Sequence, residues 1–166
     1  MLEREAQSRK TTTKSAVVDL VALLIANREA VIESARAALR RAHLPHYDSV
    51  EVAEERLSAL FDLLVDAVAR RDLTPMIEYA QCVAEERYAG GYELGEVQTA
   101  FNTLEEAAWL AVLQRLDPSE AGPALGLVGT ALGAGKDALA RRYVSLAAGT
   151  HAGAVDLRAL STGASS

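Results

Sequence analysis

The stretch ERYAGGYELGEVQTAFNTLEEAAW, residues 86–109, joins two helical patterns through a pair of glycines. After the break, Leu94, Val97 and Phe101 begin an apolar stripe whose steps of three and four residues are typical of an amphipathic helix. Either glycine can take the left-handed backbone conformation that ends a helix at little steric cost. The stretch therefore predicts two helices that meet at a sharp corner, with the aromatic ring of Tyr92 packed back over the junction.

The rest of the chain gives the same helical signal on both sides of this corner. Starts are marked by Thr74 as an N-cap before a proline and by Asp117 before Pro118, while Pro123 is expected to kink or restart the last helix. Apolar periodicity predicts helices over about 14–42, 49–71, 74–89, 94–116 and 118–149. Asp48, followed by Glu51, is expected to cap the second of these helices. We expect residues 1–13 to form a flexible arm, 14–149 a single helical domain and 150–166 a flexible tail.

Length and composition favour one all-α domain of five to six helices. The chain has 166 residues, of which 50% are hydrophobic and only 5% aromatic, so its core has to be aliphatic. A net charge of −6 disfavours binding to phosphate backbones. The charged N-terminus lacks the apolar region of a signal peptide, and no uncharged window reaches the ~20 residues of a membrane span. With a single cysteine, Cys82, the sequence predicts a cytoplasmic protein that binds neither nucleic acid nor membrane.

No constellation of residues supports catalysis or a metal site. The stretch GTALGAGKDAL, residues 129–139, has Thr130 where a phosphate loop needs its first glycine and Asp137 where it needs Ser or Thr. The histidines, at 43, 46 and 151, have no cysteine nearby, and the glutamate pairs at 54–55, 85–86 and 105–106 lack the Glu-x-x-His of a di-iron bundle. We interpret the glutamate pairs as solvated helix faces, and we predict no enzyme activity, metal or cofactor.

Two segments carry more apolar surface than one helix face needs. AVVDLVALLIA, residues 16–26, has one charge in eleven residues, so it must be buried on more than one side. Farther along, glycines at 122, 126, 129 and 133 lie beside leucines that repeat every seven residues, a pattern that favours close approach of a neighbouring helix. Both segments suggest a homodimer. The candidate interface residues are Val17, Leu20, Val21, Leu24, Leu125, Gly129, Leu132 and Gly133.

The aromatic residues suggest an alternative function, the binding of a small ligand. Aromatic side chains at helical spacing are more often plain core, but here they cluster in the third and fourth helices and could line an apolar pocket between them. The candidate pocket residues are Tyr79, Tyr92, Phe101 and Trp109. On this alternative the protein is a helical bundle that binds a small ligand. Trp109, with Leu110, Leu113 and Leu116, also makes its helix apolar on two sides, which suggests burial against a second subunit or a missing neighbour domain.

The stretch AEERYAGGYELGEVQTAFNTLEEAAWLAVL, residues 84–113, resembles the signature region of the RsbT co-antagonist (RsbRD-type) N-terminal domains, and related modules precede PucR/CdaR-like regulators. These are helical sensory modules of bacterial stress-signalling proteins. LPHYDSVEVAEERLSALFDLLVDAV, residues 44–68, is similar to the loop and second helix of the family, and the whole resemblance covers about residues 15–148. The positions that match are Glu86-Arg87, Gly91-Tyr92, Leu94, Glu96-Val97, Ala100-Phe101 and Trp109.

The resemblance implies a globin-like helical bundle without haem, a homodimer, and a role in transmitting a signal to a protein partner. The sequence departs from the family at Glu93, where a stronger helix cap is common, and in having no recognisable output domain after Gly149. We therefore expect a non-catalytic regulatory domain, whose partner is either another protein or an output domain outside these residues.

Overall fold

The computed structural model describes residue 17, residues 19–44 and residues 50–162, and every regular element in these ranges is a helix. The all-α fold class predicted from the sequence is confirmed. Asp48, expected to cap the second helix, lies outside the described residues. Residues 19–26 form a first helix, and it is followed by α2 (Arg28–Arg41), α3 (Val50–Arg70), α4 (Thr74–Ala89), α5 (Leu94–Arg115) and α6 (Pro118–Thr162).

The first helical segment differs from the sequence expectation at Asn27. Instead of one helix over residues 14–42, a turn at Asn27 separates two helices. The Asn27 side-chain amide donates a hydrogen bond to the carbonyl of Leu23 at 2.7 Å. Asparagine side chains compete in this way with the regular helical pattern, which explains an interruption that apolar periodicity does not reveal.

The corner between α4 and α5 has the predicted form. Gly91 has a φ of 76°, in the left-handed region. The amide of Tyr92 donates to the carbonyl of Arg87 at 3.0 Å and that of Gly91 to Tyr88 at 3.2 Å, the pair of bonds that closes a helix before a left-handed residue. A Cβ on Gly90 would lie 3.1 Å from the Tyr92 ring, so this ring does pack over the junction. Glu93 proves an adequate start for α5, because its amide donates to the Glu96 carboxylate at 3.1 Å.

The N-cap of α4 differs from the predicted one. Thr74 is the first residue of the helix and not its N-cap, which is Leu73. The carboxylate of Asp72 accepts a hydrogen bond from the amide of Thr74 at 2.9 Å. A carboxylate is a good acceptor for the unpaired amides of a helix start, so the acid two residues upstream takes the role that was expected of Thr74.

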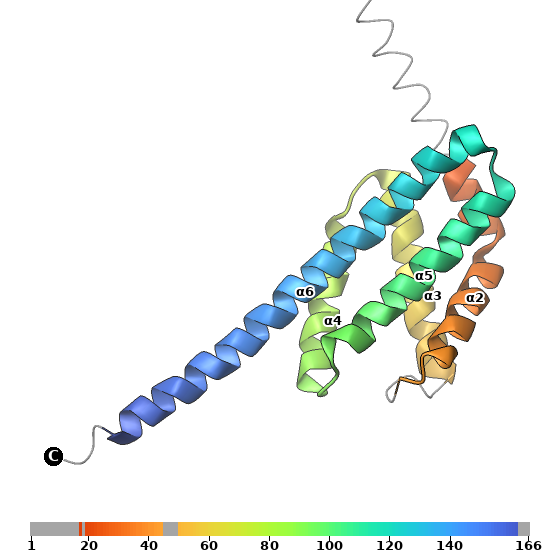
Figure 1. Ribbon diagram of the computed structural model, residues 1–166. Helices are drawn as coiled ribbons and strands as arrows, with labels where there is room; N and C mark the ends of the chain where they lie inside the picture. The colour runs from red at the N-terminus through yellow and green to blue at the C-terminus, as the bar shows by residue number, and fades with distance from the viewer. Residues whose placement is uncertain (1–16, 18, 45–49, 163–166) are drawn as a thin grey trace, which may run out of the picture.

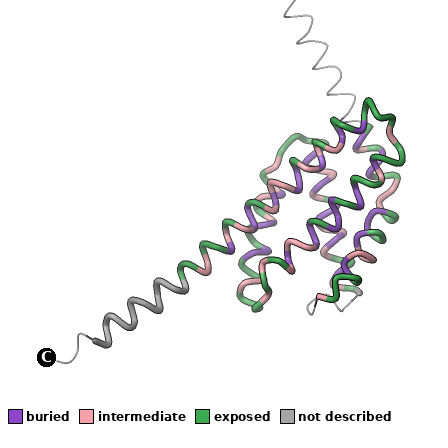
Figure 2. The backbone as a smooth tube through the Cα atoms, viewed as in Figure 1, coloured by how far each residue is buried: buried purple, intermediate pink, exposed green. Residues whose placement is uncertain are grey.

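The helices pack around one aliphatic core. In Figure 1, α6 runs along α4 and α5, and α5 lies between α2 and α6. The purple segments of Figure 2 mark the buried residues on the inner faces of these helices. The largest fully buried side chains are Leu20, Leu24, Leu39, Leu57, Phe61, Leu64, Met76, Val97, Leu104, Val112, Leu132 and Leu139.

Helix α6 is longer than the sequence predicted. It continues through Pro123 and past Gly149, where it was expected to end, as far as Thr162. Gly149 does not take a left-handed φ, since Gly91 is the only glycine with a positive φ among the described residues. Its 45 residues correspond to about 67 Å of helix. Figure 1 shows that the C-terminal part of α6 leaves the bundle and extends away from it.

Candidate functional site

The predicted dimer-interface residues lie mostly inside one copy of the chain. Val17 is 8% exposed, and Leu20, Leu24 and Leu132 are fully buried. Val21 and Leu125 are half-buried and pack against the same core, and Gly129 and Gly133 are also half-buried. The first helix therefore buries most of its apolar surface against other helices of the same chain. The homodimer stays a prediction, but the buried leucines are not free to form its interface.

The predicted pocket residues do not surround one common space. Tyr79 and Phe101 line a cavity together with Arg56 and Arg87, but this cavity has a volume of about 20 Å³. A space of that size holds roughly one water molecule. Tyr92 lies at the α4–α5 corner, and Trp109 lies on the outer side of α5, where it is 38% exposed. The structure thus brings together two of the four residues and leaves little room between them.

Tyr92 is held between two arginines at the corner. The guanidinium carbon of Arg56, on α3, lies 5.5 Å from the centroid of the Tyr92 ring, and that of Arg87, on α4, lies 5.1 Å from it. Arg56 also donates a hydrogen bond to the Tyr92 hydroxyl at 3.3 Å. This bond, followed by the positive charge of both arginines, lowers the pKa of the Tyr92 phenol. Cation–π contacts on one ring therefore connect α3 to the corner.

Helix α6 reaches the same corner through Tyr143. The Tyr143 hydroxyl donates a hydrogen bond to the backbone carbonyl of Tyr92. Its ring meets that of Tyr88 edge to face, with centroids 5.4 Å apart and an interplanar angle of 84°. Burial, followed by the nearby Glu96 carboxylate, raises the pKa of the Tyr143 phenol. Because Tyr143 is the last buried residue of α6 among the described side chains, this contact fixes the point from which the helix leaves the bundle.

A partly buried ion pair joins α5 to α6. The Lys136 ammonium lies 2.6 Å from the Glu105 carboxylate and donates a second hydrogen bond to Asn102 at 3.2 Å. The side chain of Glu105 is only 12% exposed, which corrects the expectation that the pair at 105–106 forms a solvated face. The cation contributed by α6 explains the difference, because buried carboxylates need a charged or hydrogen-bonding partner.

Large apolar side chains are exposed at the C-terminal half of α5. Trp109, Leu110 and Leu113 are 38%, 52% and 58% exposed, and their spacing places them on neighbouring positions of one helix surface. A Cβ on Gly129 of α6 would lie 4.0 Å from Cζ2 of Trp109, so the indole rests beside Gly129. We call this region the α5–α6 surface. It comprises Trp109, Leu110, Leu113, Gly122, Gly126 and Gly129.

Two glycines of this surface, Gly122 and Gly126, have open space in front of them. The two helices run antiparallel, since Lys136 meets Glu105 while Gly129 meets Trp109, so Gly126 and Gly122 follow towards the α5–α6 turn. A Cβ added at Gly122 or Gly126 would meet nothing within 4 Å. Packing within the chain therefore gives no reason for a glycine at either position.

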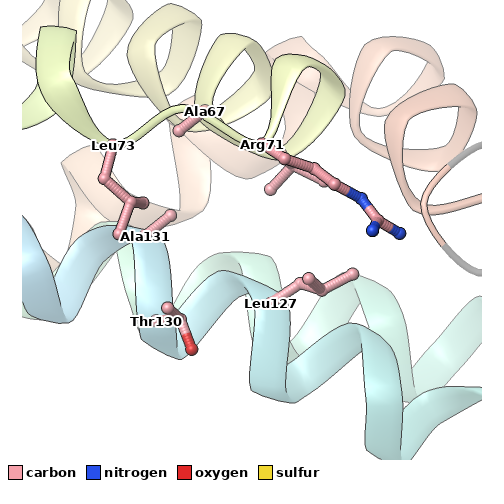
Figure 3. A pocket seen from close by; sticks show the side chains of 7 residues that line it. Ala67, Arg71, Leu73, Leu127, Thr130 and Ala131 are labelled. Atoms are coloured by element: carbon pink, nitrogen blue, oxygen red, sulfur yellow. The ribbon is translucent and has the colours of Figure 1, made fainter. Parts of the chain in front are cut away.

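A larger cavity lies elsewhere, between the α3–α4 connection and α6. Its volume is about 260 Å³, and Figure 3 shows its walls, with the α3–α4 connection on one side and α6 on the other. The residues that line it are Ala67, Val68, Arg71, Leu73, Leu127, Thr130 and Ala131. Sequence reasoning missed this cavity, because small and apolar residues from two distant segments give no signal until the fold brings them together.

The described residues contain no group of three or more His, Cys, Asp and Glu side chains that could hold a metal ion. None of the described helices has a stretch long and apolar enough to cross a membrane. No protein-family model matches the chain, and no curated protein sequence matches it. Function is therefore best inferred from the α5–α6 surface, the cavities and the projecting helix.

Proposed function

We propose that this chain is a non-catalytic regulatory module that works by binding other proteins, beginning with a second copy of itself. The observation that carries the proposal is the α5–α6 surface. Trp109, Leu110 and Leu113 are exposed together on α5, and exposed apolar patches larger than a few hundred Å² often mark protein-binding sites. Each glycine in a helix interior also costs roughly 0.5–1 kcal/mol relative to alanine, and close approach of another helix is a reason to keep it.

A second copy fits this surface well. A helix laid against Gly122 and Gly126 could bring its backbone close to α6, while Trp109 and Leu113 fill the flank of the contact. Two copies related by a twofold axis would each bury the same surface, which is the arrangement that most homodimers adopt.

The wider proposal is a bacterial cytoplasmic sensory domain of the RsbT co-antagonist type, with a globin-like helical arrangement and no haem. It is supported by the resembling stretch itself, where the left-handed Gly91 and the Tyr92 ring form the corner on which α3, α4 and α6 converge. The projecting part of α6 suits a signalling role, because a change in bundle packing at Tyr143 would be carried outward along a rigid helix.

The experiment that tests the proposal is sedimentation of the intact chain over a wide range of concentration. Wild type should form a dimer, and Leu110→Glu/Leu113→Glu should shift it to monomer, because charges would be buried at the contact. Val144→Glu is the matched control, since Val144 is 63% exposed on α6 and lies outside the α5–α6 surface. If the wild-type chain is monomeric at every concentration, the proposal of a homodimer is refuted. If the doubly substituted chain still dimerises, the α5–α6 surface is not the interface.

A further inference from the structure

We propose that the cavity between the α3–α4 connection and α6 binds a small amphiphilic carboxylate, with its apolar tail inside the cavity and its carboxylate on Arg71. The inference goes beyond the proposed function, because it concerns a ligand and a different face of the molecule. It can hold or fail whether or not the chain dimerises through the α5–α6 surface.

The size of the cavity limits the ligand. A cavity of about 150 Å³ lined by apolar side chains is known to hold benzene. The cavity here has a volume of about 260 Å³ and is partly open to solvent, so by simple proportion the part of a ligand that it encloses has about ten non-hydrogen atoms. This is smaller than a typical drug-sized or cofactor site, which begins at about 300 Å³.

The lining selects an apolar tail. Val68, Leu73 and Leu127 present aliphatic side chains, and Ala67 and Ala131 leave the space between them. In Figure 3, Leu73 lies opposite Ala131, and Leu127 lies below the extended side chain of Arg71. Ligand pockets are typically lined by apolar side chains together with a few polar or charged groups that fix the orientation of the ligand.

Arg71 selects the charge of the head group. Among the described residues that line the cavity, it is the one charged side chain. Its neighbours are occupied elsewhere: Arg70 forms an ion pair with Asp66 at 2.6 Å, and the Asp72 carboxylate accepts the amide of Thr74 at 2.9 Å. None of the ion pairs between described residues includes Arg71. A guanidinium matches a carboxylate through two parallel hydrogen bonds.

The backbone at Arg71 supports the same assignment. Arg71 has a φ of 54°, a conformation that costs energy for any residue with a Cβ and that favours glycine at the end of a helix. An arginine therefore occupies a position where glycine would be less strained. In Figure 3 its side chain extends above Leu127, and its guanidinium points away from Leu73 and Ala131.

The first test is a titration of the intact chain with three probes of equal tail length: sodium octanoate, octan-1-ol and octylamine. Methyl resonances of Val68, Leu73 and Leu127 report binding by nuclear magnetic resonance. Octanoate should give saturable shifts at these methyls, the alcohol should bind more weakly and the amine most weakly. The proposal is overturned if no probe gives saturable shifts there, or if octylamine binds as tightly as octanoate.

The second test uses matched variants. Arg71→Asn removes the charge but tolerates a left-handed φ, and it should weaken octanoate binding about fivefold, as expected for an ion pair that water can reach, while octan-1-ol binds as before. Arg70→Asn removes the same charge one residue earlier and should leave octanoate affinity unchanged. If the two variants lose affinity equally, Arg71 does not hold the carboxylate.

A third variant probes the tail. Ala131→Leu fills the cavity and should abolish saturable binding of octanoate and octan-1-ol. If this variant does not fold, the comparison of Arg71→Asn with Arg70→Asn still decides the question. A different outcome would overturn the proposal: octanoate does not bind the wild type, and Ala131→Leu changes the molar mass in solution. The cavity would then be a contact site for a side chain of another protein molecule.

Discussion

Among the described glycines, Gly135 of α6 is the one where an added Cβ would come closest to neighbouring atoms. A Cβ added there would lie 2.8 Å from Cε1 of Phe101 and 3.0 Å from Sδ of Met76. Both neighbours belong to the core, with Phe101 2% exposed and Met76 fully buried. Ordinary contacts between carbon atoms are about 3.5–4.0 Å, so Gly135→Ala forces at least one of these side chains to move.

Two effects of opposite sign act on this substitution. Overpacking a filled core costs about 1–3 kcal/mol, whereas replacing glycine by alanine inside a helix gains about 1 kcal/mol. Gly135→Ala should therefore destabilise the chain by about 1 kcal/mol. Gly133→Ala, one half-turn earlier in the same helix, should stabilise it by about 1 kcal/mol, because a Cβ there meets nothing within 4 Å.

The difference between the two variants isolates the steric cost, since the gain in helix propensity is common to both. It should be about 2 kcal/mol, or a separation of several degrees in Tm for a chain of this size. Urea unfolding followed by far-ultraviolet circular dichroism measures it, with wild type and both variants at one protein concentration. Equal stability of Gly135→Ala and Gly133→Ala would refute the close approach of α6 to Phe101 and Met76.

Three further predictions use the same unfolding assay. Tyr143→Phe removes the hydrogen bond to the Tyr92 carbonyl and should lower the free energy of unfolding by about 1 kcal/mol near neutral pH. Burial raises the pKa of Tyr143 above 10.0, so the stability that its neutral phenol contributes is complete below that pH and is lost as the pH rises further. The variant should therefore lose less stability in alkali than wild type does. Lys136→Met leaves the Glu105 carboxylate without its cation and should lower the free energy of unfolding by about 1–3 kcal/mol. The double variant Lys136→Met/Glu105→Leu should recover most of this loss, and no recovery would show that the unpaired carboxylate does not cause it. Arg71→Gly should stabilise the chain by about 1 kcal/mol by relieving the left-handed φ, and a loss of stability would contradict that strain.

The α4–α5 corner shows what local sequence can predict. A glycine pair between two apolar stripes specified the left-handed turn at Gly91, the packing of Tyr92 over it and the end of α4 at Ala89. These features depend on residues that are close in sequence, so backbone sterics and helical periodicity are enough to anticipate them.

Features that depend on distant segments were not predicted. The burial of Glu105 requires Lys136 from the next helix, and the cavity at Arg71 requires α6 to lie beside the end of α3. The apolar run at residues 16–26 was interpreted as a subunit contact, but Leu20 and Leu24 are covered by the chain itself. Excess apolar surface shows that a segment is buried, while only the three-dimensional arrangement shows by what.

The position of Trp109 has a practical consequence. It is the single tryptophan of the chain, and it lies 38% exposed on the outer side of α5. The intrinsic fluorescence excited through indole therefore originates from one place in the folded protein. A contact that shields this indole from water will move its emission to shorter wavelength, so the native chain carries its own optical reporter of such contact, with no label attached.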